Sequence, residues 1–190
     1  MSLTEITAVV FSLSCVWLAV KKHVLNWPIG IVGVCAYMIL FYREKLYADM
    51  FLQLVFIVQG IYGWMNWLKR KGNEEEIKVI YLVNKQRVLY GILIIFISAI
   101  WSYALMTYTN ASMPYVDAFA ATISLAANWL MAKKNIENWV LWIFADLIYI
   151  PLFLYKDLYL SSGIYLIFLI LSIKGLIDWS RQSNLKKVLY

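Results

Sequence analysis

Asn138, Trp142, Asp146 and Tyr149 follow one another at intervals of four, four and three residues. Successive residues of a helix are turned by about 100°, so these four side chains would share one helical face. Aromatic side chains stack on flat cationic rings, and a cation–π contact is worth about 2 kcal/mol or more where water is excluded. A carboxylate on the same face would balance the charge. The spacing therefore predicts a binding site for a cationic aromatic molecule.

Asp146 is the most informative of these residues because it lies in the middle of an apolar stretch. An unpaired carboxylate at the centre of a bilayer costs about 2.5 to 3.5 kcal/mol on insertion scales, so such a residue faces a partner or a wet cavity. Val34 occupies the corresponding position in the first half of the chain, which favours a role in a site over one in the architecture. The alternatives are a structural pair with Lys174 and protonation in place.

Polar side chains in two other apolar stretches could complete the site. Asp117, Ser124 and Asn128 are spaced by seven and four residues, which places them on one helical face. Gln53 and Gln59 lie on either side of the middle of an earlier stretch. Amides can hydrogen-bond the hydroxyls of a substrate, but polar and small residues can equally tie helices together. Both interpretations stay open at this point.

The composition indicates which elements must carry these residues. Of the 190 residues, 63% are hydrophobic and 15% are charged. This is more apolar surface than a soluble domain of that size can bury. The charges cluster between apolar stretches close to the about 20 residues that a helix needs to cross a bilayer. We expect an all-α integral membrane protein with seven transmembrane helices, at Thr4–Val20, Val24–Tyr42, Leu46–Trp67, Val88–Thr107, Tyr115–Ala132, Asn138–Tyr155 and Leu158–Trp179.

A heptad near the start of the chain, "KKHVLNW" from Lys21 to Trp27, recurs as "KKNIENW" from Lys133 to Trp139. Sliding the chain by the same interval aligns residues 8–67 with 120–179 without a gap. Identical pairs outside the heptad include Ser12 with Ser124, Trp17 with Trp129, Tyr37 with Tyr149, Gly63 with Gly175, and Trp67 with Trp179. The chain is therefore interpreted as a duplicated three-helix unit.

The duplication predicts two parallel three-helix repeats joined by one extra helix (3+1+3). Three helices end on the opposite side of the membrane from where they begin, so the extra crossing lets the second repeat start on the same side as the first. In folds with parallel repeats the substrate lies near the midplane, between the halves. A duplicated scaffold without a pathway is the alternative. The expected units are a first repeat at 1–67, a cytoplasmic loop at 68–87, a linker helix at 88–107, and a second repeat with a short cytoplasmic tail at 108–190.

Lysine and arginine are unevenly divided between the two predicted sides of the membrane. One side has only Arg43, Lys45 and Lys156, and the other collects Lys21, Lys22, Lys69, Arg70, Lys71, Lys78, Lys85, Arg87, Lys133, Lys134, Arg181, Lys186 and Lys187. This bias predicts an N-terminus outside and a C-terminus in the cytoplasm. It also explains the net charge of +6 without a nucleic-acid partner.

Most of the aromatic residues are expected to be interfacial anchors. Trp27, Trp67, Trp139 and Trp179 lie near the ends of apolar stretches. Tryptophan is enriched at the level of the lipid headgroups, so these four residues are expected to belong to the aromatic belts.

Other chemistries find little support in the sequence. The single histidine, His23, lies in a basic loop, and no cluster of His, Cys and carboxylates has metal-ligand spacing. A phosphate-binding Gly-Lys-Ser/Thr loop is also missing from the sequence. An integral-membrane enzyme would need a nucleophile, a base or a metal set at one membrane face, so we expect neither enzymatic activity nor a cofactor. A structural or assembly protein is a further alternative, which the polar midplane face disfavours.

Two stretches resemble the PnuC family of bacterial vitamin transporters: "YADMFLQLVFIVQGIYGWMNW" from Tyr47, and "NWVLWIFADLIYIPLFLYKDLYL" with the sequence that follows it, from Asn138. The resemblance covers nearly the whole chain, and Y-G-W-x-x-W and N-W-x-x-W are its most specific motifs. It implies a bacterial inner-membrane protein with a fold related to the SWEET sugar carriers. The implied activity is uptake of nicotinamide riboside by facilitated diffusion, with thiamine or another vitamin as the alternative substrate. Phosphorylation by a cytoplasmic kinase would trap the substrate, and the protein would be a homo-oligomer, with a trimer as one candidate.

The family's pocket is lined by aromatic and amide side chains, and it corresponds here to Asn138, Trp139, Trp142, Gln53, Gln59 and Asn128. The first half departs from N-W-x-x-W, because Gly30 stands where the second tryptophan would be. Nicotinamide riboside and thiamine both carry a permanently cationic aromatic ring, which agrees with the face of Trp142, Asp146 and Tyr149. The expected mechanism is a rocking of the two repeats around a central site, and a proton-coupled carrier that uses Asp146 is the alternative.

Overall fold

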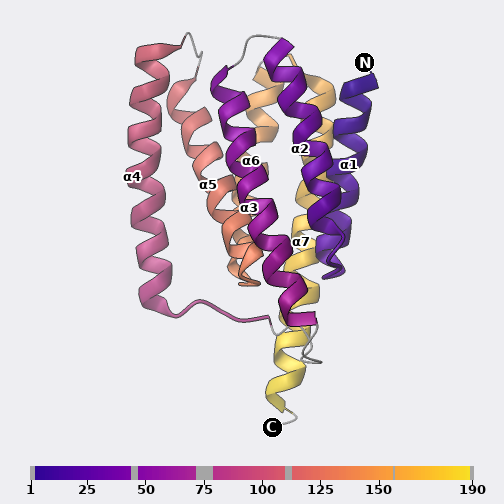
Figure 1. The fold of residues 1–190 in the computed structure, drawn as a ribbon. Coiled ribbons are helices and arrows are strands. Elements are labelled where there is room, and N and C mark those ends of the chain that lie inside the picture. Colours follow the sequence, from indigo (N-terminus) through magenta and orange to yellow (C-terminus); the bar gives the residue numbers. More distant parts are fainter. Residues whose placement is uncertain (1–2, 44–46, 72–78, 110–112, 156, 189–190) are drawn as a thin grey trace.

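The computed structural model describes residues 3–43, 47–71, 79–109, 113–155 and 157–188. Within these ranges the chain forms seven helices and, apart from one isolated bridge between Ile80 and Asn135, no β-structure. The predicted all-α fold is thus confirmed. Helix ends lie within a few residues of the expected ones, except that the last helix continues well past Trp179. The helices are α1 Leu3–Val20, α2 Asn26–Arg43, α3 Tyr47–Lys71, α4 Asn84–Tyr108, α5 Pro114–Ala132, α6 Glu137–Tyr155 and α7 Tyr159–Val188 (Figure 1).

Among the residues that the structure describes, four helical stretches are long and apolar enough to cross a membrane: Met50–Lys69, Asn84–Tyr108, Glu137–Tyr155 and Tyr159–Ser183. In α1 the apolar stretch is shorter, Ile6–Val20. Helices α2 and α5 each contain buried polar residues, among them Asn26 in α2 and Ser124 in α5. Two expectations extend beyond the described residues, namely the start of a helix at Leu46 and the part of the loop at 72–78.

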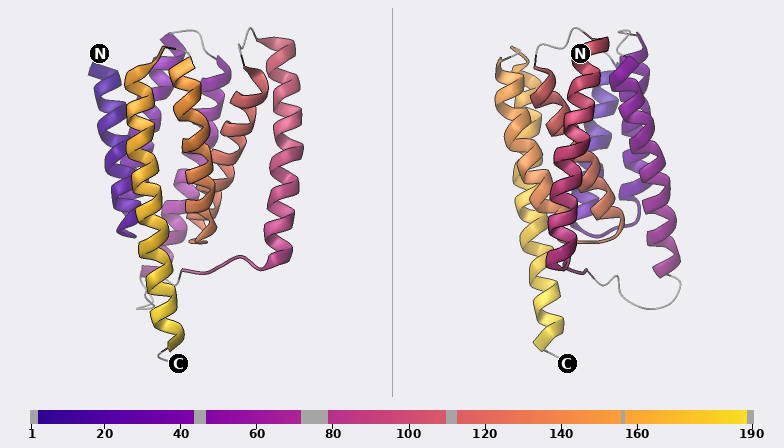
Figure 2. Two further views of the ribbon diagram at one scale, coloured as in Figure 1. Left: turned by 180° about the vertical axis from the view of Figure 1, so that it is seen from behind. Right: turned by 90° about the vertical axis from the view of Figure 1, so that its left-hand side faces the viewer.

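Six of the helices close a ring, and α4 lies outside it (Figures 1 and 2). In this ring α1 packs on α2 and α7, α3 packs on α2 and α5, and α6 packs on α5 and α7, whereas α4 packs on α5. The helices of α1–α3 and of α5–α7 run in the same order of directions, and the two chain termini lie at opposite ends of the bundle (Figure 1). The turns at 21–25 and 133–137, the segment 79–83 and the last part of α7 gather at one end, called here the lysine-rich end.

A layer of four tryptophans crosses the bundle near the lysine-rich end. This tryptophan layer comprises Trp27, Trp67, Trp139 and Trp179, whose exposed fractions are 4%, 0%, 0% and 0%. Trp27 and Trp67 meet edge to face with ring centroids 5.5 Å apart, Trp139 and Trp179 do the same at 5.4 Å, and Trp67 lies 6.3 Å from Trp179. The prediction that these residues belong to the headgroup belts is therefore wrong. Packing between helices buries their large rings more completely than an interface could.

Each half of the bundle makes room for this layer with a glycine. A Cβ atom on Gly63 would lie 2.5 Å from the ring of Trp27, and one on Gly175 would lie 2.5 Å from the ring of Trp139. Any side chain at these two positions would collide with an indole that is locked between helices. The glycines thus let α3 approach α2, and α7 approach α6, closely enough to enclose the rings.

The repeated heptad forms the two turns at the lysine-rich end. Lys22 and Lys134 have positive φ angles of 55° and 62°, so both turns reverse the backbone in the same way. The amide nitrogen of Asn26 donates a hydrogen bond to the carbonyl three residues earlier at 2.7 Å, and that of Asn138 does so at 2.6 Å. Both amides fix the turn that leads into the next helix, and the tryptophans that follow enter the tryptophan layer. The two copies of the heptad thus have the same local structure.

Candidate substrate-binding site

Asp146 is buried between α6 and α7, and 2% of its surface is exposed. The hydroxyl of Ser172 donates a hydrogen bond to its carboxylate at 3.1 Å. At the repeat-related positions stand Val34 and Gly60, which cannot form such a pair. The polar pair is therefore an addition of the second half. The alternative partner Lys174 instead forms an ion pair with Asp178 on its own helix, at 3.2 Å.

An aromatic cluster on α6 and α7 lies beside this carboxylate. Tyr165 is its centre, with ring centroids 4.8 Å from Tyr149, 5.1 Å from Phe153 and 5.5 Å from Phe168. Tyr149 lies three residues after Asp146 on α6, and Tyr165 lies seven residues before Ser172 on α7, so both rings are within two helical turns of the acidic pair. Two of its aromatic side chains, Tyr149 and Tyr165, carry a hydroxyl that can hydrogen-bond a polar molecule.

Trp142 lies on α6 between Trp139 of the tryptophan layer and Asp146. Its half-buried side chain packs against the buried cluster that contains the tryptophan layer and also against the cluster of Ile94, Ile123 and Ala145. The indole N–H is buried and has no hydrogen-bond acceptor among the described residues. A buried indole usually finds an acceptor, so this donor is available to a bound molecule.

The amides of α3 and α5 meet across the two halves. The side-chain nitrogen of Asn128 donates to the oxygen of Gln59 at 2.9 Å, and the nitrogen of Gln59 donates to the carbonyl of Leu125 at 3.3 Å. Both side chains are half-buried, as is Gln53 one to two turns earlier on α3. The structure thus brings Gln59 and Asn128 together, and their hydrogen bonds leave part of each amide free for a further partner.

Asn138 and Trp139 are placed differently from the other predicted site residues. Both have an exposed fraction of 0% and lie at the start of α6, within or beside the tryptophan layer. The side-chain oxygen of Asn138 and the indole N–H of Trp139 are buried without a hydrogen-bond partner among the described residues, and so are the same atoms of Asn26 and Trp27. Direct contact of Asn138 and Trp139 with a substrate stays a prediction, because the contacts seen for them are those of the turn and the layer.

Sequence reasoning missed Tyr165 and Ser172. Both lie on α7, so no spacing along α6 could connect them with Asp146. The duplication contains a signal for them, because Tyr165 aligns with Gln53, and Ser172 with Gly60. Where two aligned residues differ and at least one of them is polar, the position is not required by the architecture that both repeats share. Such positions are candidates for a site.

Comparisons with known proteins agree on one family. The family model described as nicotinamide mononucleotide transporter matches residues 2–181. The nicotinamide riboside transporter PnuC of Escherichia coli is 26% identical over 97% of this chain and 87% of its own length. The riboflavin/roseoflavin transporter RibM of Streptomyces davaonensis is 24% identical over 88% of this chain and 79% of its own length. A crystal structure of the vitamin B3 transporter PnuC superposes with a TM-score of 0.77 and 25% identity, over 94% of this chain and 80% of that one.

Proposed function

The chain belongs to the nicotinamide mononucleotide transporter family, and from that premise we propose that it carries nicotinamide riboside across the membrane. The observation that carries this proposal is the buried Asp146, held by Ser172 beside a cluster of aromatic side chains. A carboxylate inside a membrane bundle is costly unless it serves a charged partner or a wet path. The pyridinium ring of nicotinamide riboside is flat, aromatic and cationic, and such a ring suits both features.

The same carboxylate favours the riboside over the mononucleotide. Nicotinamide mononucleotide carries a phosphate in addition to the cationic ring, and that phosphate brings about one and a half to two negative charges at neutral pH. Placing it near Asp146 would set like charges against each other in apolar surroundings, where such repulsion is large. The riboside carries only the positive charge. Relatives such as the Escherichia coli PnuC are named for the riboside, which supports this choice.

Named side chains can be assigned to parts of the substrate. Trp142 and Tyr149 contact the pyridinium ring, and Asp146 balances its charge directly or at a distance. The ribose hydroxyls are held by amides of both halves, from Gln53, Gln59 and Asn128, and Asn138 and Trp139 close the end of the site beside the tryptophan layer. The free indole N–H of Trp142 supports this assignment, since it needs an acceptor that no described residue supplies.

Transport proceeds by rocking of the two three-helix units α1–α3 and α5–α7 around this site, with α4 as the connector. The process is facilitated diffusion, made one-directional when a cytoplasmic kinase phosphorylates the riboside. The protein lies in the bacterial inner membrane with its lysine-rich end in the cytoplasm, because that end collects most of the basic residues. It forms a homo-oligomer, and it is not an enzyme. The similar order of helix directions in the two units supports the rocking mechanism (Figure 1).

A different vitamin is the second candidate. The similarity to the riboflavin transporter RibM favours a different vitamin, because it shows that relatives of this chain are named for more than one substrate. Thiamine carries a cationic ring as nicotinamide riboside does, whereas riboflavin is neutral. Charge is therefore the property that separates riboflavin from the other two. Whichever vitamin is carried, the alternative to facilitated diffusion is a proton-coupled carrier that uses Asp146.

Uptake into liposomes tests the proposed function. Purified protein is reconstituted, and entry of radiolabelled nicotinamide riboside, nicotinamide mononucleotide and riboflavin is followed with and without a proton gradient. We expect entry of the riboside to reach equal concentrations on both sides, to be unaffected by the gradient, and to exceed that of the mononucleotide at least tenfold. Concentrative uptake driven by the gradient would favour the proton-coupled alternative. Equal entry of the mononucleotide would remove the role given to Asp146.

A further inference from the structure

The two halves of the bundle meet along two seams, the α3–α5 seam and the α1–α7 seam (Figures 1 and 2). Both are closed at the lysine-rich end by the same kind of contact. On the first seam the indole N–H of Trp67 donates to the carbonyl of Ala132 at 3.2 Å. On the second, the indole N–H of Trp179 donates to the carbonyl of Val20 at 3.3 Å. Up to this point the seams are repeat-related and equal.

The α3–α5 seam also has polar contacts, one at this same end and one further along, whose repeat-related counterparts the other seam cannot form. Asn128 and Gln59 are hydrogen-bonded across it at 2.9 Å, and Asn66 donates to the carbonyl of Ala132 at 2.8 Å. The residues that align with Asn128 and Gln59 are Val16 and Leu171, whose side chains have no hydrogen-bonding groups. Separating α3 from α5 would leave the amides of Asn128 and Gln59 without these partners in apolar surroundings, whereas Val16 and Leu171 have no such hydrogen bonds to lose.

An aromatic stack adds to this difference. Tyr62 on α3 and Trp129 on α5 lie face to face, with centroids 4.9 Å apart and planes inclined by 20°. The residues that align with them are Lys174 and Trp17. Lys174 forms its ion pair within α7, and Trp17 is 46% exposed. The ring that joins the halves on one seam thus faces outward on the other.

Helix α4 bridges the α3–α5 seam from outside. It packs along α5, and its Trp101 stacks on Phe51 of α3 with centroids 6.3 Å apart. The helix that joins the two halves therefore contacts both sides of one seam only, within the described residues. The outward faces of α1 and α7 carry exposed apolar residues instead, as at Val10 and Ile170.

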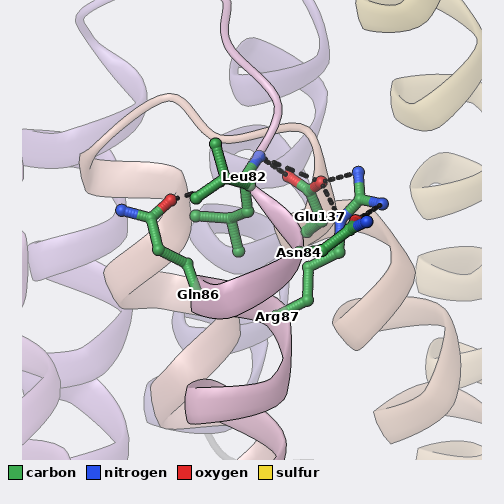
Figure 3. Close-up of polar contacts among 6 residues, drawn as sticks. Leu82, Asn84, Gln86, Arg87 and Glu137 are labelled. Carbon is green, nitrogen blue, oxygen red and sulfur yellow. Dashed lines mark hydrogen bonds and ion pairs between the residues drawn. The ribbon is translucent and has the colours of Figure 1, made fainter.

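The segment before α4 is fastened to the second half by a carboxylate. Glu137 accepts the backbone N–H of Leu82 at 3.1 Å and the guanidinium of Arg87 at 2.8 Å (Figure 3). Beside them, Ile80 exchanges backbone hydrogen bonds with the turn that carries Lys134. The residue that aligns with Glu137 is Leu25, 48% exposed, which cannot bind a backbone N–H. The turn at 133–136 is thus held to the segment before α4 through Glu137, and the repeat-related turn at 21–24 has no carboxylate at the aligned position.

We propose that the α3–α5 seam is the hinge of the bundle and that the α1–α7 seam is the one that opens, so that substrate leaves toward the lysine-rich end between α1 and α7. This inference rests on the proposed function, since it names the route of the same transport. The hydrogen bonds, the stacked rings, the clamp of α4 and the Glu137 contacts all lie on one side of the site. When the two halves rock, they rotate about the α3–α5 seam, and α1 moves away from α7.

Matched cysteine pairs test which seam must open. In a background of Cys15→Ala and Cys35→Ala, one variant carries Trp17→Cys and Lys174→Cys, and the other carries the repeat-related changes Tyr62→Cys and Trp129→Cys. Each is treated with a short rigid bis-maleimide or, as the control, with a maleimide that reacts at one end only. Bridging 17 and 174 should lower riboside uptake into liposomes at least tenfold, and bridging 62 and 129 should leave at least half of it. Equal loss at both seams, loss at 62 and 129 alone, or loss at neither would overturn the proposal.

A second readout does not depend on the substrate. Nitroxide labels on the same two pairs report the distances across each seam by pulsed electron paramagnetic resonance in lipid. Two separated distances between 17 and 174, with a single distance between 62 and 129, would support the proposal. A single distance at the first pair, or two at the second, would contradict it. If the unbridged parent carries no vitamin, the proposed function fails, and the distances still decide between the seams.

Discussion

The ammonium group of Lys134 lies 4.7 Å from the ring centroid of Trp67, a residue of the other half of the chain. Lys22 stands at the repeat-related position and lies 5.5 Å from the ring of Trp179. Each copy of the repeated heptad therefore places its second lysine on a tryptophan of the opposite half of the chain, in α3 or in α7. The two repeat-related turns, which share a positive φ at this lysine, thus make equivalent contacts with the opposite half.

A double-mutant cycle measures the first of these contacts. Lys134→Gln, Trp67→Leu and the combination are compared by thermal unfolding in detergent. Lys134 is fully buried, so we expect a coupling of about 2 kcal/mol, the value for a cation–π contact shielded from water. The matched control is the pair of Lys21 and Trp17, 5.2 Å apart and largely exposed, whose coupling should be clearly smaller. A buried pair that couples no more strongly than the exposed one would argue against a role in joining the halves.

The glycine beneath Trp139 gives a second test. Gly175→Ala places a methyl group where a Cβ would lie 2.5 Å from the indole, so the ring or the helix must move. Overpacking of this kind costs about 1 to 3 kcal/mol, and we expect a matching fall in thermal stability. Gly163→Ala on the same helix is the control, because a Cβ there meets nothing within 4 Å. Equal stability of the two variants would mean that the tryptophan layer is not tightly packed.

Loss of an aromatic face should weaken binding more than it weakens the fold. Trp142→Ala is expected to raise the Kd for nicotinamide riboside about thirtyfold, the equivalent of about 2 kcal/mol from a lost cation–π contact. Trp64→Ala on α3 removes an equally large ring that is 37% exposed, and it should leave the Kd unchanged. Isothermal titration of both variants makes the comparison. Similar affinities for the two would place the ring of the substrate elsewhere.

The charge of Asp146 is tested separately from its shape. Asp146→Asn keeps a side chain that can still accept the hydrogen bond of Ser172 but removes the negative charge. We expect at least a tenfold loss of affinity for nicotinamide riboside, because the cationic ring loses its counter-charge in apolar surroundings. Ser172→Ala retains the carboxylate and should cause a smaller loss. Wild-type affinity in Asp146→Asn would show that charge pairing plays no part in binding.

The helices were predictable and the contacts between the halves were not. Apolar stretches near 20 residues are a direct consequence of bilayer thickness, so each expected segment contains a helix. A tryptophan near the end of such a stretch, however, looks the same whether it faces headgroups or a neighbouring helix, and all four of the layer were assigned to the wrong surroundings. The duplication contained the information that was needed. Trp67 and Trp179 repeat together with Gly63 and Gly175, which is typical of packing and not of lipid exposure.

The candidate site was predictable in part for a similar reason. Spacing along a single helix groups Trp142, Asp146 and Tyr149, but it cannot identify partners from another helix. Ser172 meets Asp146, and Tyr165 meets Tyr149, only through the packing of α7 on α6. The same holds for Gln59 and Asn128, which belong to different halves and find each other across the α3–α5 seam.

A binding titration of the purified protein against nicotinamide riboside, thiamine and riboflavin tests the central claim most directly. We expect the riboside to bind most tightly, thiamine to bind at least tenfold more weakly because its substituents differ from ribose, and riboflavin to bind weakest because it lacks the positive charge that Asp146 would balance. Tight binding of riboflavin, or no binding of the riboside, would contradict a carrier built around a buried carboxylate and a cationic ring.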